Sequence, residues 1–189
     1  MSIFLGLLHY PVLNRLGEVG STAVTNVDIH DLARAARTYG VQTFFIVTPI
    51  DLQRMLVGRV LKHWTEGPGA ERLPTRSEAL KRAAVVDSLD SAIANIERET
   101  GQTPEIIVTG ANLREGIKTF ASARKHLKAS ERPALLLFGT GHGLAPGVIE
   151  RADIRLPAIE SPQEVQGYNH LSVRAAVVII LDRLFGVYE

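Results

Sequence analysis

Residues 134–172 read ALLLFGTGHGLAPGVIERADIRLPAIESPQEVQGYNHLS. The segment begins with a short apolar run at 135–138, which is typical of a strand buried on both faces of a sheet. Three glycines follow at once in 139–143, and glycine allows backbone angles and a close ligand approach that other residues forbid. A further strand is predicted at 153–159, ahead of the last helix. Two strand ends and a helix start therefore predict a pocket for a small planar ligand.

Strands and helices alternate along the rest of the chain. The other predicted strands are at 3–8, 43–47, 83–86 and 105–108, and the predicted helices are at 28–39, 51–64, 89–100, 114–128 and 171–185. This alternation predicts an α/β fold in which a parallel sheet carries helices on both faces. Residues 66–82 combine glycine, proline and basic side chains, and we expect a mobile, basic surface loop there.

The last helix contains an apolar run without a break at 175–181. Its valines and isoleucines also have strand propensity, but the length of the segment and the stop at Gly186 favour a helix. A helix that is apolar on all sides must be buried on all sides. We therefore expect a homodimer interface to cover the side of this helix that faces away from the sheet.

Composition sets further bounds. A chain of 189 residues with 46% hydrophobic residues suffices for one globular domain, which we expect to span 1–189. The net charge of +1 is no signature of a polyanion-binding protein, so a nucleic acid would have to meet a local basic patch. The absence of cysteine excludes thiolate chemistry and fits the cytoplasm. No histidine pair has metal-ligand spacing, and no apolar run could span a bilayer.

The glycine pattern alone does not identify a nucleotide site, because tight turns between strand and helix use glycine for steric reasons. A Rossmann fingerprint would follow the first strand, whereas these glycines follow the fifth. No Lys-Ser/Thr pair follows them, which excludes a phosphate-binding P-loop, and no G-x-S-x-G motif supports a hydrolase. A ligand loop and a bare turn remain equally open. His9, just past the first strand, could face the same cleft or be an ordinary loop residue.

Three segments resemble motifs of the SPOUT superfamily of RNA methyltransferases. Residues 136–144, 153–159 and 169–176 resemble its second and third motifs, and 28–41 resembles the first, with Arg34 on the arginine of that pattern. More narrowly, TNVDIHDLARAARTYGV together with FGTGHGL is similar to a small bacterial branch of SAM-dependent RNA methyltransferases. The resemblance implies an α/β knot with a C-terminal trefoil knot, S-adenosylmethionine (SAM) as cofactor, an RNA substrate and a homodimer.

The resemblance also implies a cofactor site built from three segments. Its residues are Thr109, Gly110, Ala111, Phe138, Gly139, Thr140, Gly141, Gly143, Leu144, Leu156, Pro157, Ile159, Asn169, His170, Leu171 and Ser172. Within this set we expect an apolar slot for the adenine ring, whose edge nitrogens would pair with backbone groups at the strand ends. The slot would be lined by Leu144, Leu156, Ile159 and Leu171.

The implied reaction needs little from the protein, because SAM is already an activated methyl donor and the protein must align the attack and manage one proton. The acceptor would be a base nitrogen or a ribose 2'-hydroxyl of tRNA or rRNA. Arg34 stays protonated, so we expect it to grip phosphate or orient the nucleophile. Asp28 or His30 is the better proton acceptor. For Asp28, a role at the helix N-terminus is equally open.

We expect RNA to dock on basic side chains, in part across the dimer. The expected contacts are Arg15, Arg34, Arg37, Arg72 and Arg76, together with the rest of the basic segment up to residue 82. The alternative function is a non-catalytic SAM- or RNA-binding module of the same fold, since the acidic residue often found in the glycine loop of the family is missing and His142 lies near its place. A flavodoxin-like nucleotide binder is disfavoured by the position of the glycines.

Overall fold

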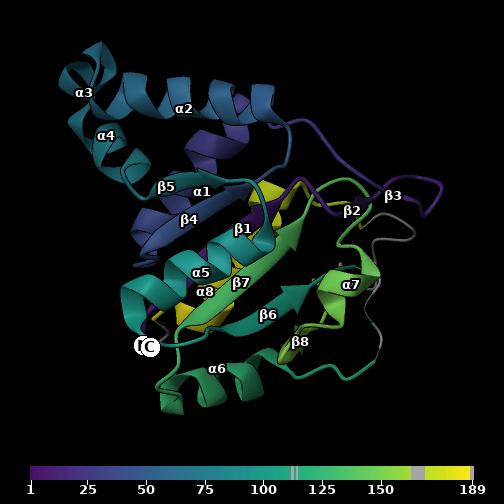
Figure 1. The fold of residues 1–189 in the computed structure, drawn as a ribbon. Coiled ribbons are helices and arrows are strands. Elements are labelled where there is room, and N and C mark those ends of the chain that lie inside the picture. Colours follow the sequence, from purple (N-terminus) through teal and green to yellow (C-terminus); the bar gives the residue numbers. More distant parts are fainter. Residues whose placement is uncertain (112, 114, 163–168, 188–189) are drawn as a thin grey trace.

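The computed structural model describes residues 1–111, 113, 115–162 and 169–187. Its centre is a parallel sheet of six strands in the order β5-β4-β1-β7-β6-β8 (Figure 1). The strands are β1 (Ile3–Leu8), β4 (Thr43–Val47), β5 (Ala83–Val86), β6 (Glu105–Thr109), β7 (Ala134–Gly139) and β8 (Ile154–Leu156). The predicted α/β fold with a parallel sheet is confirmed.

Helices cover both faces of this sheet. They are α1 (Asn26–Thr38), α2 (Asp51–Thr65), α3 (Pro68–Arg72), α4 (Pro74–Leu80), α5 (Leu89–Thr100), α6 (Phe120–Ala129), α7 (Pro146–Ile149) and α8 (Val173–Phe185). Side chains of α1, α6 and α8 share one buried cluster, and side chains of α5 and α7 belong to the cluster on the opposite face. Figure 1 shows α5 in front of the sheet and α8 behind it.

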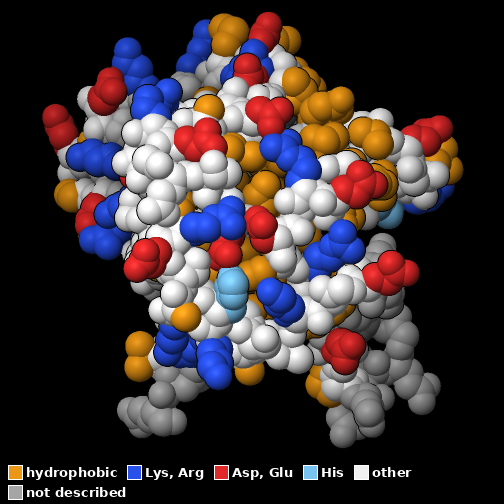
Figure 2. Space-filling model, turned by 60° about the horizontal axis from the view of Figure 1, so that its bottom comes forward, with side chains coloured by type: hydrophobic (Ala, Val, Ile, Leu, Met, Phe, Trp, Pro, Cys, Tyr) orange, Lys and Arg blue, Asp and Glu red, His pale blue; other side chains and the backbone are white. Residues whose placement is uncertain are grey.

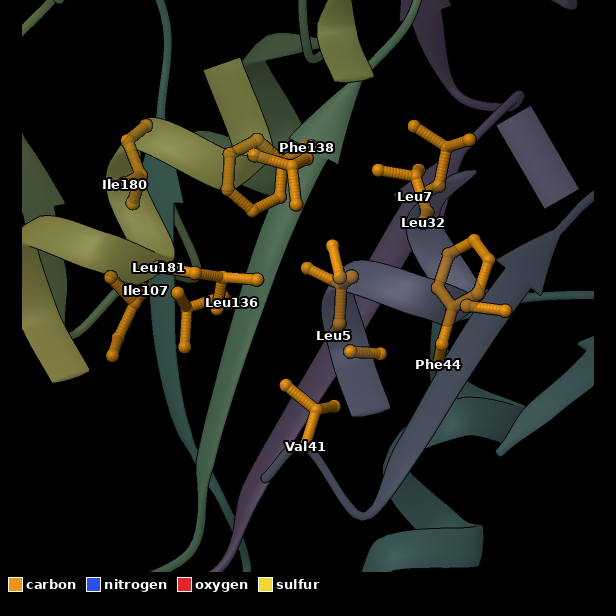
Figure 3. Close-up of a cluster of buried hydrophobic side chains, with 14 of the residues drawn as sticks. Leu5, Leu7, Leu32, Val41, Phe44, Ile107, Leu136, Phe138, Ile180 and Leu181 are labelled. Carbon is orange, nitrogen blue, oxygen red and sulfur yellow. The ribbon is translucent and has the colours of Figure 1, made fainter. Parts of the chain in front are cut away.

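The central strands alternate between these two clusters. In β1, Leu5 and Leu7 belong to the cluster under α1 and α8, whereas Phe4 and Leu8 belong to the opposite one. The same alternation runs along β7, where Leu136 and Phe138 belong to the cluster that also contains Ile180 and Leu181 of α8 (Figure 3). Both faces of these strands are buried, which is why their sequences are apolar without a break.

The prediction of a mobile loop at 66–82 is wrong, because two short helices fill most of it. Each begins with a proline at its first helical position, where the missing backbone N–H is not needed. Leu80 is buried in the cluster shared with α1, and Gly69 lies against Trp64, where a Cβ would come within 2.7 Å of the indole. Packing against α1 and α2 therefore orders this segment.

Among the other predicted elements, two differ most from the bounds in the structure. The helix expected at 114–128 begins only at Phe120, capped by Thr119, while Arg114 lies outside the described residues. Lys118 N–H instead donates to Arg155 O at 2.9 Å, alongside β8. The strand expected at 153–159 is shorter because Pro157, directly after β8, has no N–H for the ladder.

A small hairpin was also not predicted. The connection after β1 contains β2 (Val12–Leu13) and β3 (Val19–Gly20), which pair antiparallel. Figure 1 places this hairpin at the opposite end of the molecule from α3 and α4.

The last helix leaves part of its apolar surface uncovered. Val177, Ile180, Leu181 and Leu184 are buried against the sheet, but Val178 is 41% exposed. In the part of the chain that the structure describes, no helix is both long enough and apolar enough to cross a membrane.

Candidate cofactor site and its flanking surfaces

Three of the predicted cofactor segments leave the sheet at the same edge. β6 lies between β7 and β8, and both pairings are parallel. Thr109, the last residue of β6, pairs in register with Leu156, the last residue of β8. The segments that follow these strands, which begin at Gly110, Thr140 and Pro157, therefore start at the carboxyl edge, where open α/β sheets bind ligands.

The second of these segments, residues 139–144, is called the glycine loop here. It turns back so tightly that a Cβ on Gly139 would lie 2.7 Å from the backbone nitrogen of Leu144. Gly141 and Gly143 have φ angles of +61° and +109°, which glycine adopts without strain. No described atom lies within 4 Å of a Cβ built on Gly143, so the loop leaves open space on that side.

The glycine loop is held by the hairpin β2–β3. His142 N–H donates to Leu13 O, and Leu13 N–H donates to Gly143 O, both at 2.9 Å. All three glycines are therefore required by the folding of the loop, at 139 by close packing and at 141 and 143 by a positive φ, and the one at 143 also faces free space. The sequence left open whether these glycines form a bare turn or a ligand loop. In this geometry the same residues can do both.

The third segment is closed by an amide side chain. Asn169 Nδ2 donates to Ile159 O at 2.8 Å and so joins the end of the β8 segment to the residues before α8. Ser172 caps α8, since its Oγ accepts from Ala175 N–H at 3.3 Å. His170 and Leu171 lie between these two residues and are exposed, while Tyr168, which the sequence pattern includes in this turn, lies outside the described residues.

The predicted adenine slot is only partly assembled from side chains. Leu156 is buried in the cluster under α8, and Ile159 packs against that cluster. Leu171, two residues before α8 begins, is 48% exposed. Leu144 instead packs into the cluster on the other face of the sheet and is 4% exposed. Phe138 is 3% exposed in the core. These two can offer a ligand chiefly their backbone groups.

Asp28 is buried at the start of α1 and already has partners for both carboxylate oxygens. Oδ2 accepts from the Thr25 hydroxyl at 2.5 Å, and Oδ1 accepts from Arg174 Nη1 at 2.6 Å. Each oxygen is thus engaged once, and each keeps a second lone pair. Arg174 was not among the predicted site residues, and the two members of this ion pair are 146 positions apart in the sequence.

The structure does not bring His30 together with Asp28. Two residues along a helix correspond to a rotation of about 200°, so the two side chains leave α1 on nearly opposite sides. His30 packs edge-on against Trp64, with ring centroids 5.3 Å apart. Its pKa is lowered, first by burial and then by the positive charge of Arg76. A lowered pKa keeps the ring neutral at physiological pH.

Arg34 lies between two hollows that flank α1. The first, about 330 Å³ in volume, is called the arginine hollow here and is lined by Arg34, Arg37, Thr38, Leu73, Thr75, Arg76 and Ala79. The second, about 640 Å³, lies between α1 and α8 and is lined by Asp31, Arg34, Ala35, Thr38, Tyr39, Arg174, Ala175, Val178 and Ile179. The Arg34 side chain is 63% exposed, with Asp31 at 3.9 Å.

Arg34 lies far along α1 from the carboxyl edge. Helices of this fold begin at that edge, and Arg34 comes eight residues after Asn26. At 1.5 Å per residue, this corresponds to about 12 Å along the helix axis. A single chain therefore holds Arg34 away from the glycine loop.

The other predicted RNA contacts are divided between two ends of the molecule. Arg37 forms an ion pair with Glu78, and the Arg76 guanidinium lies over Trp64 at 5.2 Å from the ring centroid. Both line the arginine hollow, and Arg72 ends the neighbouring α3. Arg15, by contrast, lies at the tip of the β2–β3 hairpin, at the far end in Figure 1.

Charges elsewhere are mixed. On the face shown in Figure 2, acidic and basic side chains are interspersed, in keeping with the net charge of +1. Attraction of a polyanion therefore depends on local groups such as the arginine hollow. Among the described residues, no three His, Asp or Glu side chains gather in a way that could hold a metal ion.

Comparison with known proteins identifies the family. Residues 2–186 match the family described as SAM-dependent RNA methyltransferase. A curated relative named tRNA (guanine-N(1)-)-methyltransferase, from Nitratidesulfovibrio vulgaris, is 48% identical over 185 residues, which make up 98% of this chain but 42% of that protein. The chain thus spans less than half the length of this relative.

Solved structures agree on the fold. A methylase family protein from Neisseria gonorrhoeae superposes with a TM-score of 0.63 at 17% identity, covering 97% of this chain and 81% of that one. The SpoU methyltransferase AviRb from Streptomyces viridochromogenes gives 0.58 at 17% identity, with coverages of 97% and 58%. The family match agrees with the methyltransferase function that the sequence resemblance implies. The chain belongs to the SAM-dependent RNA methyltransferase family, and its fold is that of the SPOUT methyltransferases.

Proposed function

We propose that the three segments at the carboxyl edge bind SAM and that the protein, as a homodimer, methylates tRNA. The observation that carries this proposal is the convergence at one edge of the glycine loop, the end of β6 and the turn closed by Asn169. Residues 1–189 act in this scheme as one methyltransferase domain in the cytoplasm.

The residues at this edge fit the cofactor. The open side of Gly143 lets a ligand approach the backbone of the loop. Leu156 and Ile159 offer apolar surface for a planar ring, and backbone groups at strand ends offer hydrogen bonds to its edge. When bound, SAM supplies an activated methyl group. The chain's own task is to orient the acceptor and to receive one proton.

The path of the chain supports the trefoil knot that the family resemblance implies. β8 lies at the edge of the sheet beyond β6, yet α8, the next helix, packs against β7, α1 and α6. The chain therefore crosses back under the sheet after its edge strand. This crossing also returns Asn169 and Ser172 to the carboxyl edge, where they belong to the proposed site.

A second copy of the chain would complete the site. The hollow between α1 and α8 is lined by the exposed Val178 and the partly buried Ile179, which a partner helix could bury. Arg34 borders the same hollow and is about 12 Å from its own carboxyl edge by helix geometry. Across a dimer, Arg34 of one chain would serve the cofactor site of the other, gripping a phosphate or orienting the nucleophile.

The arginine hollow is the proposed docking surface for the RNA backbone. Arg34 and Arg76 line it, and guanidinium groups bind phosphate through paired hydrogen bonds. Arg37 would exchange its ion pair with Glu78 for a phosphate, and Arg72 would add a contact at its rim. Arg15 lies at the tip of the β2–β3 hairpin, apart from this hollow, and would meet another part of the RNA.

The choice of tRNA is supported by the name of the relative, although more than half of that protein has no counterpart in this chain. The acceptor atom is therefore a question for experiment, with a base nitrogen and a ribose 2'-hydroxyl as the candidates. The protein is incubated with labelled SAM and either total tRNA or ribosomal RNA, and the labelled nucleotide is mapped by mass spectrometry. We expect label in tRNA. Label in ribosomal RNA alone would mean that ribosomal RNA, and not tRNA, is the substrate. Failure of SAM to bind in calorimetry would refute the proposed cofactor site.

A further inference from the structure

A row of hydrogen bonds lies directly beneath the glycine loop. His9, which follows β1, is fully buried, and its Nδ1 lies 3.1 Å from Thr22 Oγ1. Thr22 Oγ1 lies 2.5 Å from Thr140 Oγ1, and the Thr140 hydroxyl donates to Leu8 O at 3.0 Å. The row thus connects the ends of β1 and β7 through a residue of the segment before α1.

The direction of every hydrogen bond in this row follows from its last member. A carbonyl oxygen only accepts, so the single hydroxyl proton of Thr140 is committed to Leu8 O. Thr22 must then donate to Thr140, which leaves Thr22 without a proton for His9. Nδ1 of His9 must therefore carry the proton and donate to Thr22. The geometry assigns one tautomer of the imidazole, with the proton on Nδ1.

The other ring nitrogen agrees with this assignment. His9 Nε2 is buried, and no described group lies within hydrogen-bond distance of it. With the proton on Nδ1, the atom left without a partner is a bare acceptor rather than an N–H donor. A buried ring in this state is neutral, and the pKa of His9 is lowered to about 4 because burial disfavours the charged form.

The row fixes the glycine loop at two adjacent residues. Thr140 is held through both its hydroxyl and its backbone N–H, which donates to Leu8 O at 3.2 Å. A Cβ on Gly141 would come within 3.3 Å of Thr22 Cγ2, so the loop rests directly on Thr22. Thr22 in turn is held by its N–H, which donates to His9 O at 2.9 Å, and its O accepts from Gln53 Nε2 at 3.3 Å.

We propose that His9 is a positioning residue for the cofactor: through Thr22 and Thr140 it holds the glycine loop in the conformation that binds SAM. This inference rests on the proposed function, because it requires the glycine loop to be part of the SAM site. His9 itself is fully buried, so it would act through Thr22 and Thr140 rather than by direct contact. Its substitution is therefore expected to weaken SAM binding while the turnover number at saturating SAM changes little.

The first test measures SAM affinity by calorimetry. His9→Leu removes the donor to Thr22, and we expect its Kd for SAM to rise about tenfold, the effect of losing one buried hydrogen bond. Thr140→Val interrupts the same row and should have a similar effect, and the double variant should be no worse than either single one. His9→Asn restores an N–H donor near the position of Nδ1 and should stay within about threefold of the wild type.

A matched control is available at the other end of the sheet. His126 also pairs with a side chain at a strand end, Glu105, at 2.9 Å, but far from the carboxyl edge. His126→Leu should leave the Kd for SAM unchanged. If His9→Leu binds SAM as the wild type does, or if His9→Asn is as weak as His9→Leu, the positioning role is refuted.

The second test needs no cofactor. Nitrogen-15 NMR of the histidine side chains distinguishes a protonated from an unprotonated ring nitrogen, and we expect His9 to show a protonated Nδ1 and a bare Nε2. The opposite tautomer would overturn the assigned direction of the row and with it the inference. If wild-type protein binds no SAM, the proposed site and the inference both fall; if it binds and His9→Leu matches it, only the inference falls.

Discussion

The carboxyl edge of the sheet and the arginine hollow offer a ligand different kinds of atoms. At the edge, the glycine loop and the turn closed by Asn169 present mostly backbone groups, and the loop rests on buried hydrogen bonds. The arginine hollow presents long charged side chains, of which Arg34 is 63% exposed. The first region is rigid and suited to one small molecule; the second can adapt to a flexible polyanion.

This difference predicts different responses to substitution. A change in the glycine loop or beneath it must disturb packed backbone, and its cost appears in folding and in SAM affinity together. A change in the arginine hollow removes an exposed charge, and its cost appears in RNA binding and salt dependence with little effect on folding.

The largest effect concerns the buried support of the glycine loop and is visible in the pH dependence of stability. The pKa of His9 is lowered from 6.5 to about 4 by burial. Between these values the unfolded chain binds a proton that the folded chain does not, so the free energy of unfolding rises as the pH rises from 4 to 6.5. The contribution is about 3 kcal/mol and is complete above pH 6.5.

Urea denaturation at pH 4.5 and pH 7 measures this contribution. Carboxylates titrate in both wild type and His9→Asn, so the difference between the two proteins isolates the imidazole. We expect the wild type to gain more stability than the variant over this range. Equal gains in the two proteins would mean that His9 is not buried as a neutral ring.

The next effect concerns the backbone of the glycine loop. In Gly139→Ala, the new Cβ would lie 2.7 Å from the Leu144 nitrogen, and backbone atoms cannot move aside as a flexible side chain can. We expect a loss of about 2–3 kcal/mol of stability and a SAM affinity weaker by about a hundredfold. Gly147→Ala, where nothing lies within 4 Å of the added atom, is the control. Calorimetry that finds both variants equal to wild type would place the cofactor elsewhere.

The same contrast explains which parts of the molecule were predictable. The strands at 3–8, 43–47 and 83–86 were predicted with the bounds that the structure has, because each is an apolar run bounded by turn residues. A ligand pocket at the strand ends could be predicted from these strands and from the glycines that follow them. Local signals of this kind need no knowledge of tertiary contacts.

Features built from distant side chains were not predictable. Pro68 and Pro74 signal a loop as readily as a first helical position, and only the packing of Gly69 against Trp64 and of Leu80 against α1 favours helices. The pairing of Asp28 with Arg174 has no local signature either. Asp28, His30 and Arg34 looked like one catalytic group in sequence, but helix geometry directs the first away from the other two.

A smaller effect on stability is expected at Asp28, which connects α1 to α8. In Asp28→Asn, one of two ion pairs between α1 and α8 is lost, while Arg174, 35% exposed, can reach water and keeps Asp31 at 3.6 Å. We expect a loss of about 2 kcal/mol of stability, below the cost of a fully buried pair. The exposed pair of Asp51 and Arg54 gives the control Asp51→Asn, which should cost less than about 1 kcal/mol. If Asp28→Asn keeps its stability but loses methyl transfer at saturating SAM, Asp28 is the proton acceptor rather than a structural residue.

The smallest effect belongs to the arginine hollow. Arg34→Ala removes one exposed cation, so we expect tRNA affinity to fall about tenfold at low salt and the slope of log K against log salt to become shallower by about one phosphate contact. Stability should stay unchanged, because the side chain is 63% exposed. Arg98→Ala, on α5 across the sheet, is the matched control. Filter binding over a salt series measures this slope for both variants. If the two slopes are the same, the RNA docks on a surface other than the arginine hollow. That result would not bear on the SAM site at the carboxyl edge.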